Sequence, residues 1–206
     1  MEIKAEGIDY ITGSSTFVVD DLPPTKHAIV LDLDETIINC SMIKTVDYSF
    51  SVKVGNHRRA YISSRPGLHE FLKEVSIMFD IFFFTASSKM YANQIIDTIL
   101  PDTPSDHRFF CTSCRNIYGY SVKDLSLIGR PMSQILLIDD IIGSAILQPE
   151  NLICITPWDG DQNDTVLLDQ LLPILVRVKE EGNLPLATRK ILDQNSSLFK
   201  NLFSFR

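Results

Sequence analysis

Four short runs of the sequence are almost continuously apolar, with no regular alternation of apolar and polar residues. They span residues 28–31, 81–84, 134–138 and 152–155. Runs of this kind are typical of strands that are buried on both faces of a parallel sheet. Segments with helical patterns lie between or after them, at 67–76, 89–100, 125–128 and 164–177. The alternation of strand and helix predicts an α/β fold with a doubly wound parallel sheet.

Two segments interrupt this alternation. Residues 48–62 alternate between apolar and polar side chains around Gly55-Asn56, which predicts an antiparallel β-hairpin. Residues 101–120 are polar and rich in turn formers, and they lie between the second and third predicted strands. We therefore expect a small insertion at about 101–120.

The ends of the chain differ in character from its centre. Residues 1–25 end in Leu22-Pro23-Pro24, and the prolines mark a boundary because they extend neither a helix interior nor a strand ladder. We expect an N-terminal leader at 1–25, one domain at 26–180 and a helical C-terminal tail at 181–206. A length of 206 residues suits a single compact domain.

Composition and charge exclude several classes of protein. The formal net charge of −7 argues against direct nucleic-acid binding, which needs a concentrated basic face. The apolar segment 166–178 contains Asp169 and Arg177 and is too short and too polar to span a membrane. The first ten residues lack a secretory pattern, and with four cysteines present we expect the reduced interior of a cell, in the nucleus or the cytoplasm.

The residues that follow the predicted strands are mainly carboxylates and a hydroxyl. They are Asp32 and Asp34, then Thr85, then Asp139 with Asp140. Lys123 precedes the third strand. Because ligands of open α/β sheets bind beyond the carboxyl ends of the strands, we expect these side chains to form one site.

Phosphoryl transfer is the chemistry that this set fits. Carboxylates that converge on one sheet edge repel each other unless a hard cation is present, and Mg²⁺ prefers such oxygen ligands together with phosphate and water. Lys123 and the hydroxyl of Thr85 would contact the phosphate. The spacing of Asp32 and Asp34 suits a nucleophile and a general acid.

The cysteines of the insertion offer a different chemistry. Cys111-x-x-Cys114 with His107 nearby is compatible with zinc or with a redox pair. A structural zinc site needs four ligands and only three are close in sequence, and redox pairs usually begin a helix after a strand. We expect two unlinked thiols here.

Five short motifs occur in a fixed order along the chain. They are Asp32-Leu33-Asp34-Glu35-Thr36, Arg65-Pro66-Gly67-Leu68, Thr85-Ala86-Ser87, Val122-Lys123-Asp124-Leu125 and Ile138-Asp139-Asp140. In this order they resemble the haloacid-dehalogenase (HAD) superfamily. More narrowly, residues 22–180 are similar to its FCP/SCP branch, the phosphatases of the RNA polymerase II C-terminal domain.

The resemblance implies a role for each matched residue. Asp32 would attack phosphorus and form an aspartyl-phosphate, Asp34 would act as general acid and then general base, and Thr85 and Lys123 would hold the phosphate. Mg²⁺ would bind to Asp32, the backbone carbonyl of Asp34 and Asp140, with Asp139 close by. Further substrate contacts are expected from Ala86, Ser87, Tyr91 and Arg65.

The resemblance also implies that the insertion is a small antiparallel β-sheet that leaves the site open to a peptide. Relatives often carry a substrate-binding arginine where this chain has Cys111, and Arg108 and Arg115 are the candidates to replace it. We therefore expect a Mg²⁺-dependent protein serine/threonine phosphatase, with the polymerase C-terminal domain as one candidate substrate. A small-metabolite phosphatase and a non-catalytic scaffold of the same fold are the alternatives. The oligomeric state is not indicated.

Overall fold

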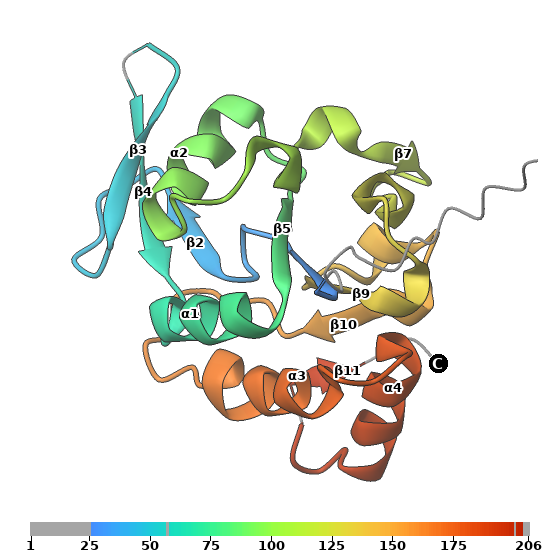
Figure 1. The fold of residues 1–206 in the computed structure, drawn as a ribbon. Helices are drawn as coiled ribbons and strands as arrows, with labels where there is room; N and C mark the ends of the chain where they lie inside the picture. The colour runs from blue at the N-terminus through green and yellow to red at the C-terminus, as the bar shows by residue number, and fades with distance from the viewer. Residues whose placement is uncertain (1–25, 57, 200, 204–206) are drawn as a thin grey trace, which may run out of the picture.

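The computed structural model describes residues 26–56, 58–199 and 201–203, so the predicted leader at 1–25 lies outside the described residues. These residues contain a central six-stranded sheet in the order β11-β10-β9-β1-β5-β6 (Figure 1). Its strands are β1 Ala28–Leu31, β5 Asp80–Phe84, β6 Arg108–Phe109, β9 Ile135–Asp139, β10 Leu152–Ile155 and β11 Leu202–Phe203. The first five are parallel, and β11 pairs antiparallel with β10. This confirms the predicted α/β class and its parallel sheet.

The position of β1 determines where a ligand can bind. The chain leaves β1 toward β5 and β6, then returns to place β9 and β10 on the other side of β1. The crevice beyond β1 and β9 is therefore the switch point at which open α/β sheets bind ligands. Leu31 pairs with Ile138, and the N–H of Asp32 donates to the Ile138 carbonyl at 3.0 Å. The segments that follow these two strands therefore begin side by side at the same edge of the sheet.

The two faces of the sheet are covered differently. Ile29 and Leu31 belong to a core with helices α1 Leu68–Met78, α2 Lys89–Ile99 and α3 Leu172–Val178, and α1 lies next to α3 on this face (Figure 1). Ala28 and Val30 point to the other face. All four residues of β1 are fully buried, as expected for a strand with two covered faces.

Short 3₁₀ turns cover the second face in place of α-helices. The turns are η3 Leu125–Ile128, η4 Met132–Gln134, η5 Ile142–Ala145 and η6 Pro149–Asn151, and apolar side chains of η3 and η5 enter the core there. The predicted helix at 125–128 is thus a single 3₁₀ turn. Asp124 caps its start by accepting from the N–H of Ser126, and Gly129, with a φ of 72°, ends it. A segment this short cannot propagate an α-helix.

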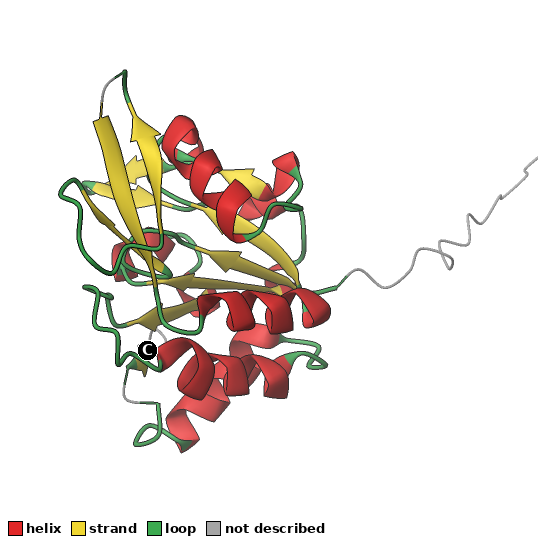
Figure 2. Ribbon diagram, turned by 90° about the vertical axis from the view of Figure 1, so that its left-hand side faces the viewer, coloured by secondary structure: helices red, strands yellow, loops and turns green. Residues whose placement is uncertain are grey.

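The predicted hairpin is present and belongs to a three-stranded sheet. β3 Phe50–Val54 and β4 Arg58–Ser64 are antiparallel, and β2 Ile38–Ser41 pairs with the other edge of β4. This sheet projects beyond the central sheet at one end of the molecule (Figures 1 and 2). The sequence did not indicate β2, because four residues with two polar side chains carry too little strand pattern.

The insertion contributes to two sheets. Within the predicted range 101–120, β6 joins the edge of the central sheet, where Phe109 stacks on Phe84 with ring centroids 5.1 Å apart. The small antiparallel sheet consists of β7 Arg115–Ile117 and β8 Tyr120–Val122, and it extends past the predicted end of the insertion. Tyr118 and Gly119 both have positive φ, as a two-residue hairpin turn requires.

The C-terminal part packs onto the domain. A π-helical turn η7 Val166–Leu171 leads into α3, and α4 Leu184–Gln194 follows, with Asn183 accepting from the N–H of Leu186 at its start. Within the predicted tail at 181–206, Leu184 and Leu192 are buried and β11 extends the central sheet. In the part of the chain that is described, no helix has the length and apolarity needed to cross a membrane.

Candidate active site

Two carboxylates and an ammonium meet where β1 and β9 end. The Nζ of Lys123 lies 2.6 Å from Oδ1 of Asp32 and 2.5 Å from Oδ2 of Asp139. Lys123 is only 3% exposed, and both carboxylates are also buried. The N–H of Lys123 donates to the Ser144 carbonyl at 2.8 Å, which attaches the end of β8 to the segment that follows β9. The predicted Asp32, Lys123 and Asp139 are therefore neighbours.

The charges of this buried group are strongly coupled. Burial alone lowers the pKa of a lysine, but Asp139 and Asp32 outweigh this effect and raise the pKa of Lys123 above its ordinary value. Burial raises the pKa of Asp32 to about 7, with Lys123 opposing and Asp139 adding to the rise. Lys123 therefore stays protonated, and its single positive charge does not balance the negative charges of the carboxylates around it.

Oxygen atoms that could bind a cation are grouped at the same place, where β1 and β9 end. Asp32, Asp139 and Asp140 offer carboxylate oxygens within 4.8 Å of one another. Thr36 donates its hydroxyl to Oδ1 of Asp140 at 2.9 Å and to Oδ2 of Asp32 at 3.3 Å. An all-oxygen set with one ammonium for three acidic side chains fits Mg²⁺. Thr36 was not among the predicted site residues, although its place in Asp32-Leu33-Asp34-Glu35-Thr36 was the available signal.

Asp34 faces a different set of partners. The hydroxyl of Tyr91 donates to its Oδ1 at 2.7 Å, and the hydroxyl of Ser87 donates to its Oδ2 at 2.8 Å. Ser88 caps the start of α2 and so fixes the turn that carries Tyr91. Burial and the charge of Asp34 raise the pKa of Tyr91 well above its ordinary value, which keeps the phenol protonated as a donor. The side chain of Asp34 is not part of the acidic group formed by Asp32, Asp139 and Asp140.

The loop after β5 supplies the remaining predicted residues. Thr85 is buried, and its Oγ1 accepts from the N–H of Ser87 at 3.0 Å. Ala86 lies between them and is exposed. The N–H of Cys111 donates to the Ser87 carbonyl at 3.0 Å, which links this loop to the insertion. Thr85, Ala86 and Ser87 therefore follow β5 at the same sheet edge as Asp32 follows β1.

Arg65, which was expected to contact the substrate, lies inside the protein. It is 1% exposed, and its guanidinium holds Asp164 with two bonds of 2.8 Å and donates to the carbonyls of Thr36 and Thr156. Each nitrogen of the guanidinium is thereby engaged inside the protein. Its role is to join the loop after β1 to the segment that leads to α3.

The insertion shows no sign of a zinc site among the described residues. His107 stacks on Phe82, and its Nδ1 lies 2.9 Å from the Ile81 carbonyl, so its ring is used in packing. Cys111 is a free, exposed thiol, and Cys114 is also free. Of the two arginines expected to replace the family's substrate-binding residue, Arg108 pairs with Asp97 at 2.6 Å and Arg115 with Asp124 at 2.7 Å.

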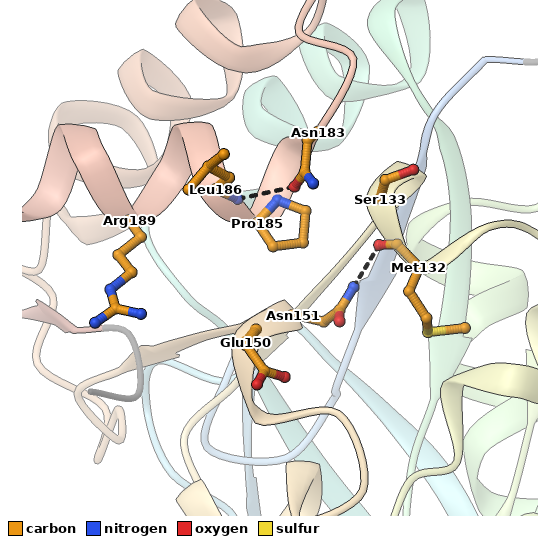
Figure 3. Close-up of a pocket in the computed structure, with 8 residues that line it drawn as sticks. All are labelled: Met132, Ser133, Glu150, Asn151, Asn183, Pro185, Leu186 and Arg189. Carbon is orange, nitrogen blue, oxygen red and sulfur yellow. Dashed lines mark hydrogen bonds between the residues drawn. The ribbon is translucent and has the colours of Figure 1, made fainter.

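A hollow lies at the opposite edge of the sheet, lined by residues of the segments before β9 and β10 and by α4 (Figure 3). Ser133 lines it just before β9 begins, and Asn183 lines it at the start of α4. Its best-placed polar groups are used by the fold: Asn151 donates to the carbonyls of Met132 and Ile135, and Asn183 caps α4. Asp32 and Asp139, with the other predicted site residues, lie at the other ends of the strands.

This geometry defines the class of protein as an HAD-type phosphatase fold, and comparison with known families agrees. The chain belongs to the NLI interacting factor-like phosphatase family, whose sequence model matches residues 27–185. Phosphatase PSR1 of Saccharomyces cerevisiae is 35% identical over 177 residues, which cover 84% of this chain and 41% of the yeast protein. The CTD small phosphatase-like protein of Homo sapiens is 34% identical over 161 residues, covering 77% of this chain and 58% of that protein. The predicted family is confirmed.

Comparison with other relatives limits which of their properties can be inferred for this chain. CTD small phosphatase-like protein 2 of Dictyostelium discoideum is 38% identical over 162 residues, covering 75% of this chain and 28% of that protein. This chain thus spans less than two thirds of each of these three relatives. Among solved structures, Fcp1, described as an essential RNA polymerase II CTD phosphatase, has a TM-score of 0.53 and 23% identity, over 82% of this chain and 54% of that one. At this identity the likeness establishes the fold.

Proposed function

We propose that this protein is a Mg²⁺-dependent phosphatase that acts on phosphoserine or phosphothreonine in proteins, through an aspartyl-phosphate on Asp32. The observation that carries the proposal is the separation of two carboxylates with different partners. Asp32 contacts an ammonium, and Asp34 is held by the hydroxyls of Tyr91 and Ser87. One environment suits a nucleophile beside a phosphate, and the other orients a second, separate carboxylate for proton transfer.

The two steps follow from these positions. An oxygen of Asp32 attacks phosphorus, the bond from phosphorus to the serine or threonine oxygen breaks, and Asp34 gives that oxygen its proton. Asp34 then takes a proton from water, the water oxygen attacks the aspartyl-phosphate, and inorganic phosphate leaves as the Asp32 carboxylate is restored. Lys123 stays protonated beside Asp32 and balances the phosphate charge, and Thr85 offers its hydroxyl to the phosphate oxygens.

A magnesium ion fits the acidic group described above. Asp32, Asp139 and Asp140 are the side chains that would hold it, with the backbone carbonyl of Asp34 as a further oxygen ligand. When bound, the ion would neutralise the phosphate charge and orient the substrate. Thr36 orients Asp140 and Asp32 toward each other, a supporting contact of the kind that metal ligands usually have.

A phosphorylated protein is the substrate class that the surroundings favour. Asp34 and Ser87 are only partly buried and Ala86 is exposed, so a phosphate on a polypeptide can reach the site from solvent. The described insertion adds only the two-stranded sheet β7–β8 near the site. Relatives named as CTD small phosphatases make the polymerase C-terminal domain one candidate, and that substrate would place the protein in the nucleus.

Substrate profiling with controlled metal tests the proposal. The full chain is assayed against phosphoserine peptides, including phosphorylated heptads of the polymerase C-terminal domain, and against sugar phosphates and nucleotides. We expect peptides to be turned over fastest, and treatment with a chelator to abolish turnover until Mg²⁺ is restored. A preference for a sugar phosphate or nucleotide would instead identify a small-metabolite phosphatase, and no turnover of any phosphoester with Mg²⁺ present would indicate a scaffold.

Tyr91 gives a second test, directed at the role of Asp34. Tyr91→Phe removes the 2.7 Å bond to Oδ1 of Asp34 and leaves the bond from Ser87. Loss of one such hydrogen bond costs at least about 1.4 kcal/mol, which corresponds to about tenfold in rate. In quenched-flow measurements of the first step, we expect aspartyl-phosphate to form about tenfold more slowly from a phosphoserine peptide, with a smaller loss on p-nitrophenyl phosphate, whose leaving group needs no proton. Equal losses on both substrates would contradict the role of Asp34 as general acid.

A further inference from the structure

Large apolar side chains lie exposed directly beside the candidate active site. Ile141 and Ile142 follow the ligand pair Asp139-Asp140, and they are 50% and 43% exposed. Tyr120, on β8, is 47% exposed, and Ile146 is 37% exposed. Contiguous exposed apolar side chains often mark a surface that contacts a partner.

Some of these side chains form a groove with a definite shape. Tyr120, Ile142, Gly143, Ile146 and Pro149 line a cavity of about 420 Å³, which we call the apolar groove. No charged side chain lines it, although the protein carries a formal net charge of −7. It therefore suits an apolar group better than a second phosphate or a charged side chain.

The floor of the apolar groove depends on a glycine. A Cβ on Gly143 would clash with the ring of Tyr120, so the ring can rest against the backbone only because position 143 has no side chain. The bond from the N–H of Lys123 to the Ser144 carbonyl holds the same two segments together. The groove is thus a built feature in which β8 lies along η5.

The same two segments carry catalytic residues. Val122, which ends β8, is followed by Lys123, and Asp140 stands two positions before Ile142. An extended peptide advances about 3.3 Å per residue, so a side chain within about three residues of a bound phosphoserine spans roughly 10 Å. Because the lining residues Tyr120 and Ile142 stand three and two positions from Lys123 and Asp140, a substrate side chain close in sequence to the phosphoserine is the group best placed to occupy the apolar groove.

We propose that the apolar groove binds a large aliphatic side chain of the substrate, close in sequence to the phosphorylated residue. This inference rests on the proposed protein phosphatase function and specifies which phosphoproteins the site selects. The occupant is assigned to the substrate because the groove is continuous with the segments that carry Lys123 and Asp140. Its neutral lining matches an aliphatic group such as leucine.

Peptide binding and turnover test the proposal separately. Phosphoserine peptides in a Gly/Ser background carry one leucine at each position within about three residues of the phosphoserine. Binding is measured by fluorescence anisotropy to the Asp32→Asn chain with Mg²⁺, so it reports docking whether or not the protein is a phosphatase. We expect leucine at one or two positions to improve affinity about tenfold, the factor that corresponds to about 1.4 kcal/mol. Ile146→Asn in the same background should remove that gain and leave the leucine-free peptide unaffected.

A matched substitution controls for general effects. Ile77 is a 63% exposed isoleucine near the end of α1, at the opposite edge of the sheet, and Ile77→Asn should preserve the leucine preference. Turnover of p-nitrophenyl phosphate by Ile146→Asn and Ile77→Asn chains that retain Asp32 reports an intact site.

The inference is overturned if leucine improves binding nowhere, or if Ile146→Asn leaves the gain intact. It is also overturned if sedimentation shows that the groove pairs two copies of the chain and Ile146→Asn only separates them. Absence of turnover with all substrates would contradict the proposed function and leave the binding result to decide on the groove.

Discussion

Replacing Asp32 by asparagine is expected to lower the turnover of a phosphoserine peptide by on the order of 10⁴-fold or more, the scale on which enzymes lose activity when a nucleophile is removed. The amide cannot attack phosphorus, and it also weakens the contact with Lys123. Initial rates with saturating Mg²⁺ give the size of the loss. Urea unfolding of the variant verifies that the fold remains.

Asp34→Asn serves as the matched control because it makes the same chemical change two residues away. With p-nitrophenyl phosphate the first step needs no proton donor, whereas hydrolysis of the aspartyl-phosphate still needs Asp34 as a base. We therefore expect the Asp34→Asn protein to accumulate phosphate on Asp32. Intact-protein mass spectrometry after acid quenching detects it, and the Asp32→Asn protein should show none. Turnover by Asp32→Asn near the wild-type rate, or no phosphorylated protein with Asp34→Asn, would contradict the assigned roles.

Replacing Arg65 by methionine is expected to reduce the free energy of unfolding by about 3 kcal/mol or more, as is typical when one partner of a buried ion pair is removed. The change leaves Asp164 without its two guanidinium bonds and two carbonyls without their donor. Trp158 is the single tryptophan of the chain and is buried, so its fluorescence reports unfolding in urea. The midpoint should fall by about 1 M or more.

Arg189→Met is the control for this experiment. Arg189 pairs with Asp193 at 3.9 Å with both side chains about half exposed, and such pairs contribute about 0–1 kcal/mol. Arg65→Lys keeps the positive charge but cannot make the two guanidinium bonds to Asp164, so its stability should be intermediate. It also supplies a folded protein if the methionine variant does not fold. An unchanged midpoint for Arg65→Met together with weaker peptide turnover would restore Arg65 as a substrate contact.

The sequence alone determined most of the central sheet and the inventory of the site. Each run that forms β1, β5, β9 and β10 is apolar on both faces, a local property that needs no knowledge of its neighbours. Because parallel strands end at one edge, the positions of Asp32, Thr85 and Asp139 directly after or at the ends of such strands sufficed to predict that they lie at one edge of the sheet. The hairpin at 48–62 also followed from local alternation and a turn.

Only the tertiary structure decided what the remaining residues do. The motif around Arg65 indicated that the residue matters, but its partners Asp164 and Thr156 lie 99 and 91 positions away, so a structural role could not be separated from a substrate contact. Thr36 likewise donates to Asp140, which lies 104 positions away in the sequence. The ring of Tyr120 packs against Gly143, another contact between distant segments. Patterns within a segment fix which face of an element is buried, whereas the partner of a polar side chain is set by which distant segments the fold brings together.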